Sequence, residues 1–95
     1  MDKFEWDNNK QKINLDLHGV DFMIASLIFD DDNCFHKVDD RCDYGEIRYQ
    51  TIGKVFDREL FVVWTYRGKR IRIISARYAN KKEKRFYDEN ISKAN

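Results

Sequence analysis

Nine lysine and arginine side chains gather between residues 67 and 85 of this 95-residue chain, against a single acid, Glu83. Tyr66 and Tyr78 stand beside and within this basic segment. Cations neutralise phosphates and aromatic rings stack on bases, so the combination favours contact with a nucleic acid. Composition alone leaves two other interpretations open: a solvated cationic face that keeps a sheet edge soluble, and a docking face for an acidic protein.

Metal chemistry is a weaker interpretation. Cys34, His36 and Cys42 supply three ligands of the zinc type, but their spacing matches no usual zinc motif. The aspartates within 30–32 and 39–43 lack the ligand order and the glycine of a calcium-binding loop. We therefore expect no bound metal and no cofactor.

Two further sets of titratable groups have no partner that the sequence identifies. His18 precedes Gly19 at the expected end of a helix, where a histidine complements the helix dipole more often than it catalyses. Glu5 and Glu46 would act as paired carboxylates only if the fold brought them together.

The first half of the chain predicts helices. Asp7 caps a helix over residues 9–17, which Gly19 ends, and a second helix follows over residues 22–29. Residues 30–45 contain six aspartates and no sustained periodicity, which indicates a polar loop.

The second half predicts strands over residues 46–55, 59–67 and 70–77. The middle strand is apolar on both faces, so we expect it at the centre of the sheet. A helix follows from Asn80 to about Ile91, because Asn80 and the glutamate three residues later form a capping box.

These elements predict one α+β domain over residues 1–95. Its antiparallel sheet is expected to be a three-strand meander with a short edge strand at residues 4–6. Two N-terminal helices and one C-terminal helix would pack against it. Alternation along the last strand would put Ser75 and Arg77 on the same face as Ile73.

The charge of the chain is divided between its halves, although the net value is only +1. Residues 1–46 carry five Lys or Arg against twelve Asp or Glu, whereas residues 47–95 carry thirteen against five. Such a division points to a polyanionic or oppositely charged partner. No apolar run is long enough to span a membrane and the first residues do not resemble a signal peptide, so we expect a cytoplasmic protein.

Several segments resemble the BrnT toxin family. They are Phe4-Glu5-Trp6-Asp7, His18-Gly19-Val20, Tyr44-Gly45-Glu46, Thr65-Tyr66-Arg67 and, most specifically, residues 70–83 with Ile71-Arg72-Ile73-Ile74-Ser75-Ala76-Arg77. The resemblance covers residues 4 to about 88. It departs at position 17, where family members often carry Lys before the His-Gly pair and this chain has Leu17, which suits packing.

The resemblance implies a RelE-like fold and the toxin of a type II toxin–antitoxin pair. The activity that it implies is RNA cleavage that halts translation, so we expect a metal-independent endoribonuclease with RNA as its substrate. The implied partner is a BrnA-like antitoxin with a ribbon-helix-helix domain, and operator DNA would be bound only through the toxin–antitoxin complex that represses the operon. The alternative is a non-catalytic nucleic-acid-binding module that uses the basic segment.

The family's motif also implies the site residues. Arg67, Ser75 and Arg77 are the first expected catalytic positions, with Lys81 and Tyr87 after them. The other cations of the basic segment are expected to bind RNA: Lys69, Arg70, Arg72, Lys82 and Arg85.

Each expected catalytic residue has a role that fits its chemistry. Arginines stabilise the charge that builds on a phosphate under attack, and Ser75 would orient a phosphate oxygen. The general base is open among Lys81, Glu83, Tyr87 and His18. Whether Arg67 and Arg77 meet at one phosphate is also open. The acidic loop 30–46 should lie away from the cationic face, because its charge would repel RNA.

Overall fold

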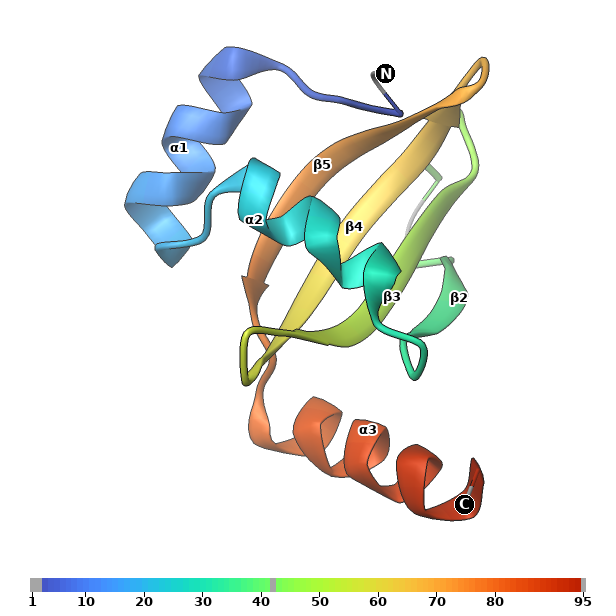
Figure 1. Ribbon diagram of the computed structural model, residues 1–95. Coiled ribbons are helices and arrows are strands. Elements are labelled where there is room, and N and C mark those ends of the chain that lie inside the picture. The colour runs from blue at the N-terminus through green and yellow to red at the C-terminus, as the bar shows by residue number, and fades with distance from the viewer. Residues whose placement is uncertain (1–2, 42, 95) are drawn as a thin grey trace.

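A five-stranded mixed sheet lies at the centre of the structure (Figure 1), a computed structural model that describes residues 3–41 and 43–94. The strands are arranged in the order β1-β5-β4-β3-β2. β1 (Phe4–Glu5) runs parallel to β5, and the other neighbours are antiparallel. The bounds of these other strands are Phe35–Asp39 for β2, Arg48–Val55 for β3, Arg58–Arg67 for β4 and Arg70–Tyr78 for β5.

The prediction of a three-strand meander is wrong for the sheet as a whole, although the N-terminal edge strand and the central position of β4 are confirmed. β2 adds a fifth strand inside the segment predicted as a polar loop. Phe35 and Val38 point to opposite faces of β2, so the strand shows no apolar alternation. Edge strands commonly carry charged side chains, and pairing with β3 therefore forms β2 without a strong sequence signal.

Two N-terminal helices pack against the sheet, as predicted. They are α1 (Asn8–His18) and α2 (Phe22–Ser26), the latter continued by a 3₁₀ turn over Leu27–Asp30. Phe22 and Ala25 of α2 and Ile28 of the 3₁₀ turn are completely buried against one face of the sheet, which we call the first face. Val62 and Ile73 of this face belong to the same core.

The start and end of α1 are formed by the residues expected to cap it. The Asp7 carboxylate accepts hydrogen bonds from the backbone N–H groups of Asn9 and Lys10. Gly19 ends the helix with a φ of 69°, a left-handed conformation that glycine adopts without steric cost.

α1 covers the free edge of β5. The side-chain amide of Asn14 donates to the carbonyl of Ala76 at 2.8 Å and accepts from its N–H at 3.0 Å, as a neighbouring strand would. The same amide donates to the carbonyl of Val20 at 3.0 Å. Asn14 is buried, so one helical side chain satisfies the edge that the short β1 leaves open.

A register shift in β5 changes which residues share a face. Val63 lies opposite Ser75 but its neighbour Trp64 lies opposite Ile73, so Ile74 is the extra residue of a β-bulge. The predicted alternation is therefore wrong beyond Ile73: Ser75 and Arg77 point away from the first face, while Ala76 joins the core. We call the side that holds Ser75 and Arg77 the second face.

α3 (Lys81–Ala94) lies across the end of the sheet where β3 turns into β4 (Figure 1). Its predicted capping box is confirmed, because Asn80 Oδ1 accepts from the N–H of Glu83 and Glu83 Oε1 accepts from the N–H of Asn80. This box fixes Glu83 beside the last residues of β5.

Candidate nucleic-acid interface

The bulge puts Arg77 on the second face, where Arg67, Arg70 and Arg72 also lie, but these arginines do not meet at one point. Arg67 lies opposite Arg70 beside the hairpin, whereas Arg77 lies opposite Phe61 at the other end of the sheet. Phe61 is six residues from Arg67 along β4. At roughly 3.3 Å per residue, the Cα atoms of Arg67 and Arg77 are therefore about 20 Å apart. They therefore cannot hold the same phosphate.

The hairpin end of the second face contains arginines that are paired with carboxylates. Glu46 accepts hydrogen bonds from Arg48 at 3.0 Å and Arg67 at 3.2 Å. The hydrogen bond from Arg48 and the charge of Arg67 lower the pKa of Glu46. Glu5 accepts from Arg72 at 2.7 Å, so Glu5 and Glu46 each pair with arginine and not with each other.

Part of the acidic segment crosses the second face. The Thr65 hydroxyl donates to the carbonyl of Ile47 at 2.6 Å, and Glu46 reaches Arg67. The expectation that the loop 30–46 avoids the cationic face is therefore wrong for its C-terminal end, because Glu46 pairs with Arg48 and Arg67. The start of the loop lies elsewhere, where Asp31 accepts from the N–H of Lys54 at 2.8 Å.

Arg77 lies at the α3 end of the second face in an ordered environment. Its guanidinium donates to both oxygens of Glu83, at 2.8 and 2.9 Å, and stacks 4.1 Å from the centre of the Phe61 ring. Burial acts to raise the pKa of Glu83, but the hydrogen bonds from Arg77 and the Asn80 N–H outweigh it and lower that pKa. Glu83 is therefore ionised at neutral pH.

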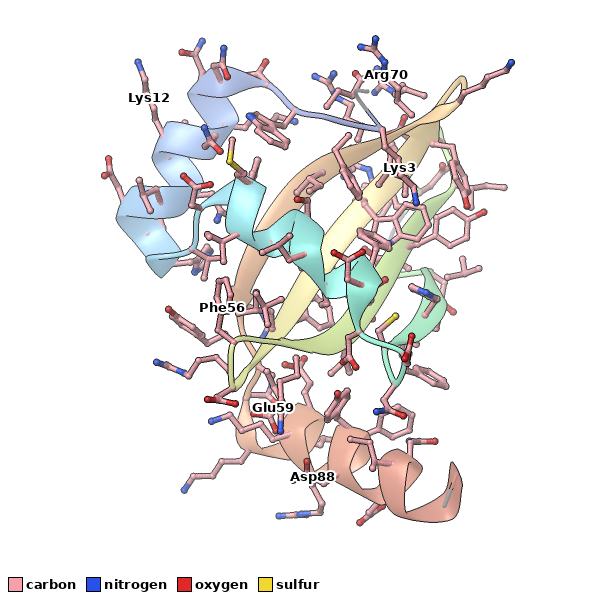
Figure 2. All side chains as sticks on the ribbon, viewed as in Figure 1. Lys3, Lys12, Phe56, Glu59, Arg70 and Asp88 are labelled. Atoms are coloured by element: carbon pink, nitrogen blue, oxygen red, sulfur yellow. The ribbon has the colours of Figure 1, made fainter. Side chains whose placement is uncertain are left out.

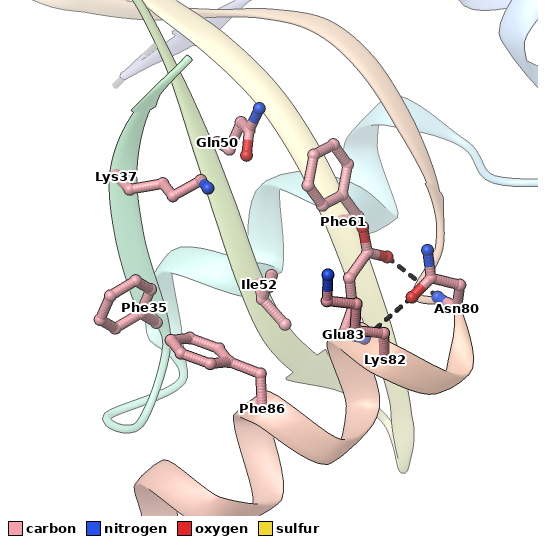
Figure 3. A pocket seen from close by; sticks show the side chains of 9 residues that line it. All are labelled: Phe35, Lys37, Gln50, Ile52, Phe61, Asn80, Lys82, Glu83 and Phe86. Carbon is pink, nitrogen blue, oxygen red and sulfur yellow. Dashed lines mark hydrogen bonds between the residues drawn. The ribbon is translucent and has the colours of Figure 1, made fainter. Parts of the chain in front are cut away.

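A hollow of about 400 Å³ lies beside this pair, between the second face and α3 (Figure 3). Its apolar walls are Phe35, Ile52, Phe61 and Phe86. Its polar rim is formed by Lys37, Gln50, Asn80, Lys82 and Glu83. It thus combines aromatic surface with cations beside Arg77.

The other expected site residues are spread over the molecule. Lys81 and Lys82 are exposed in the first turn of α3, and Arg85 is exposed further along it. Ser75 is half-buried in the middle of the second face. The remaining expected RNA-binding cations, Lys69, Arg70 and Arg72, lie at the hairpin end, where Figure 2 labels Arg70.

Tyr87 does not face this interface. Its side chain is almost completely buried under α3, and its hydroxyl donates a short hydrogen bond to the Asp31 carboxylate. Burial, together with that carboxylate, raises the pKa of the phenol. The hydroxyl is therefore protonated and already bonded to Asp31, and Tyr87 does not line the hollow.

Comparison with protein families identifies the chain. Residues 6–83 match the family described as the ribonuclease toxin BrnT of type II toxin–antitoxin systems. The chain belongs to this family. A toxin of this type has RNA as its target and an antitoxin as its partner. A comparison with curated proteins gives no significant match.

The BrnT match includes Arg67, Ser75, Arg77 and the first turn of α3, and it ends at Glu83. Tyr87 and Arg85 lie beyond it. In the described part of the chain, no helix is long and apolar enough to cross a membrane.

The residues considered for metal binding have other contacts in this BrnT-family chain. Cys34 Sγ lies 3.5 Å from His36 Nε2, while His36 Nδ1 lies 2.7 Å from the Thr51 hydroxyl. Cys42 lies outside the described residues. Among residues 3–41 and 43–94, no group of three acidic, histidine or cysteine side chains is arranged to hold a metal ion. His18 is the last residue of α1.

Sequence reasoning missed half of the hollow. Phe35 and Lys37 fall in the segment predicted as a loop, and Gln50 and Phe86 have no feature that marks them. The period-two spacing of Phe35, Lys37 and Asp39 is the one signal that could have found the β2 wall, since these three share the second face.

Proposed function

We propose that this toxin is a metal-independent endoribonuclease with a RelE-like fold, whose reacting groups lie where β5 meets α3. The observation that carries the proposal is the Arg77–Glu83 pair: a fork of donors and an ionised carboxylate held within 2.9 Å of each other on the exposed second face. An arginine fork matches a phosphate, and a carboxylate can take a proton.

The reaction needs three events at one phosphodiester. The 2′-oxygen attacks phosphorus and forms a cyclic phosphate, the bond to the 5′-oxygen breaks, and a proton leaves the 2′-hydroxyl while another joins the 5′-oxygen. We assign Arg77 to the charge on the phosphate and Glu83 to the 2′-hydroxyl proton. Lys81, in the same first turn of α3, is assigned to the 5′-oxygen, and Ser75 to orienting a phosphate oxygen.

The remaining expected residues take other roles in this proposal. Arg67 is too far from Arg77 for the same phosphate, so it is assigned to binding RNA further along the strand. Lys69, Arg70 and Arg72 act with it at the hairpin end, and Lys82 and Arg85 at α3. Tyr87 is removed from the catalytic set, because its buried hydroxyl is bonded to Asp31.

The biological setting follows from the family. We propose that the toxin cleaves RNA in the cytoplasm and so inhibits translation and growth. A BrnA-like antitoxin with a ribbon-helix-helix domain would neutralise it, and the complex would repress its own operon. The toxin alone should then not bind operator DNA specifically, which a gel-shift titration of toxin, antitoxin and their complex measures.

Cleavage of single-stranded RNA by the purified toxin, in the presence of EDTA, tests the proposal. Arg77→Ala should lower the rate about 10²–10³-fold. Glu83→Gln keeps a capping-box residue and should lower it about 10²–10⁴-fold. Arg58→Ala is the matched control. Arg58 stacks on Tyr78 beside the β3–β4 turn and is not among the proposed site residues, so this variant should cleave RNA at the wild-type rate.

Two results would contradict the proposal. Loss of wild-type cleavage in EDTA, with recovery on adding a divalent metal, would show that the metal-independent reaction is wrong. Wild-type protein that binds RNA with a steep salt dependence but leaves it intact would favour the alternative, a non-catalytic nucleic-acid-binding module.

A further inference from the structure

We propose that the hollow beside Arg77 is a nucleobase pocket, which takes one unstacked base of single-stranded RNA whose neighbouring phosphate lies at Arg77. This inference rests on the proposed function only in that RNA is the ligand. It concerns how the RNA is held, and it adds Phe35, Phe86 and Gln50 to the site.

The walls of the hollow present aromatic surface of the kind on which bases stack. The Phe35 and Phe86 rings lie 4.8 Å apart at 78°, edge to face, and so hold each other in position. Phe86 nevertheless remains 38% exposed. Figure 3 shows the two rings side by side at one end of the hollow. Base–aromatic stacking needs such a fixed ring with a free face.

The rim of the hollow carries charge that suits a nucleotide. Lys37 on β2 and Lys82 on α3 line it on opposite sides, and Arg77 lies just beyond Phe61 and Glu83. The phosphates that flank an inserted base would meet these cations. The volume of about 400 Å³ falls in the range of roughly 300–1,000 Å³ typical of small-molecule sites.

One polar group that lines the hollow, Gln50, has a fixed orientation. The Gln50 amide nitrogen donates to Asp39 at 3.0 Å, and Asp39 is a carboxylate that also accepts two hydrogen bonds from Arg41. Because Asp39 can only accept, the Gln50 carbonyl oxygen must point the other way, and Figure 3 shows it turned into the hollow. An acceptor that faces the hollow can receive an N–H from the edge of a base.

An apolar side chain of the antitoxin is a different occupant of the same hollow. The two lysines and the inward acceptor favour a base, because an apolar side chain would leave the Gln50 oxygen without a donor. The antitoxin is therefore an outcome of the test below.

The test compares two ligands that the proposed reaction cannot cleave: a 2′-O-methyl RNA octamer and an abasic octamer with the same phosphates. Phe35→Leu and Phe86→Leu keep the walls apolar but remove the rings. Each should weaken binding of the base-containing octamer roughly 5- to 100-fold. Gln50→Met should weaken it about 2- to 10-fold. The abasic octamer should bind all three variants as it binds the wild type. The matched control is Phe56→Leu, a ring that is 72% exposed at the β3–β4 turn (Figure 2).

Each outcome is decisive and is separate from the cleavage assay. Equal losses for both octamers, or none, would overturn the base pocket while leaving the endoribonuclease proposal in place. Phe35→Leu and Phe86→Leu that weaken binding of the antitoxin but not of the octamer would also overturn it, in favour of a protein side chain. Conversely, a wild type that cleaves nothing but shows the expected base-dependent losses would retain the pocket and reject the enzyme.

Discussion

The Arg77 guanidinium is held between an acid and an aromatic ring before any RNA arrives. Glu83 accepts both of its forked hydrogen bonds, and Phe61 supports its face. In the reaction that we propose, a phosphate replaces Glu83 as the partner of Arg77, which leaves the carboxylate free to take a proton. The pair thus connects binding of RNA with release of the proposed base.

A substitution of Tyr87 can distinguish a structural role of this residue from a catalytic one. Tyr87→Phe removes the hydroxyl that donates to Asp31, which keeps its hydrogen bonds from the N–H groups of Lys54 and Asn33. We expect the free energy of unfolding to fall by about 1–2 kcal/mol and the rate of RNA cleavage to stay within about twofold of the wild type. Denaturant unfolding and the cleavage assay measure the two effects. A rate loss of two orders of magnitude with normal stability would return Tyr87 to the catalytic set.

Asp39 should make stability depend on acid pH. Its side chain is completely buried, and the hydrogen bonds from Arg41, with one from Gln50, lower its pKa from 3.8 to about 2. A pKa that is lower in the folded state contributes stability above pH 4, which is lost as the pH falls toward 2. The loss should amount to about 2 kcal/mol.

Urea unfolding at a series of pH values checks this expectation. Asp39→Asn cannot titrate, so its stability should fall less between pH 4 and pH 2 than that of the wild type. An identical decrease in both proteins would show that other carboxylates cause the acid sensitivity.

At the scale of elements, the edge of β5 is closed by a helix and not by a strand. The Asn14 side chain makes three buried hydrogen bonds to the backbone: with the N–H and the carbonyl of Ala76, and with the carbonyl of Val20. Such a residue connects α1, the loop after it and the last strand, so its loss should affect all three.

Asn14→Ala should lower the free energy of unfolding by about 2–4 kcal/mol, because it leaves buried backbone groups of Ala76 and Val20 without partners. Asn9→Ala, on the exposed first turn of the same helix, is the control for helix propensity and should change stability by less than about 0.5 kcal/mol. Thermal unfolding followed by circular dichroism measures both. Equal effects would mean that the edge contact contributes nothing specific.

Elements defined by local signals were predictable, whereas those set by distant partners were not. Asp7, Gly19 and the Asn80 capping box act within a few residues of themselves, so the ends of the helices follow from the sequence. The bulge at Ile74 depends on the register between β4 and β5, which no short pattern records. The extra residue moves Ser75 and Arg77 to the second face. The sequence therefore located the candidate site along the chain, but it did not predict which side chains share a face.

At the scale of the whole molecule, the divided charge of the sequence is partly neutralised by folding. Glu5 pairs with Arg72 and Glu46 with Arg67, each acid from the first half meeting an arginine from the second. Lys69 and Arg70 at the hairpin, and Lys81 and Lys82 at α3, remain exposed. The second face therefore has a cationic region at each end.

A long RNA should contact both ends, which salt dependence can measure. Replacing Lys69 and Arg70 together by Ala should reduce the slope of log affinity against log salt by about 1.4 for single-stranded RNA, with cleavage at saturating RNA unchanged. The control replaces Lys10 and Lys12 on α1, where Figure 2 labels Lys12 away from the hairpin. A slope that changes equally in both double variants would reject the hairpin as an RNA contact.

The closure of β5 by the N-terminal part of the chain also governs when a growing chain can fold. Glu5 pairs with Arg72, which is 67 positions later in the chain, and Asn14 bonds to Ala76, which is 62 positions later. During synthesis, α1 and β1 therefore have nothing to pair with until β5 has left the ribosome, and α3 with the proposed base emerges after that. An interrupted chain that stops before β5 lacks both the closed sheet and Arg77, so we expect abortive translation products of this toxin to lack the proposed RNA-cleaving activity.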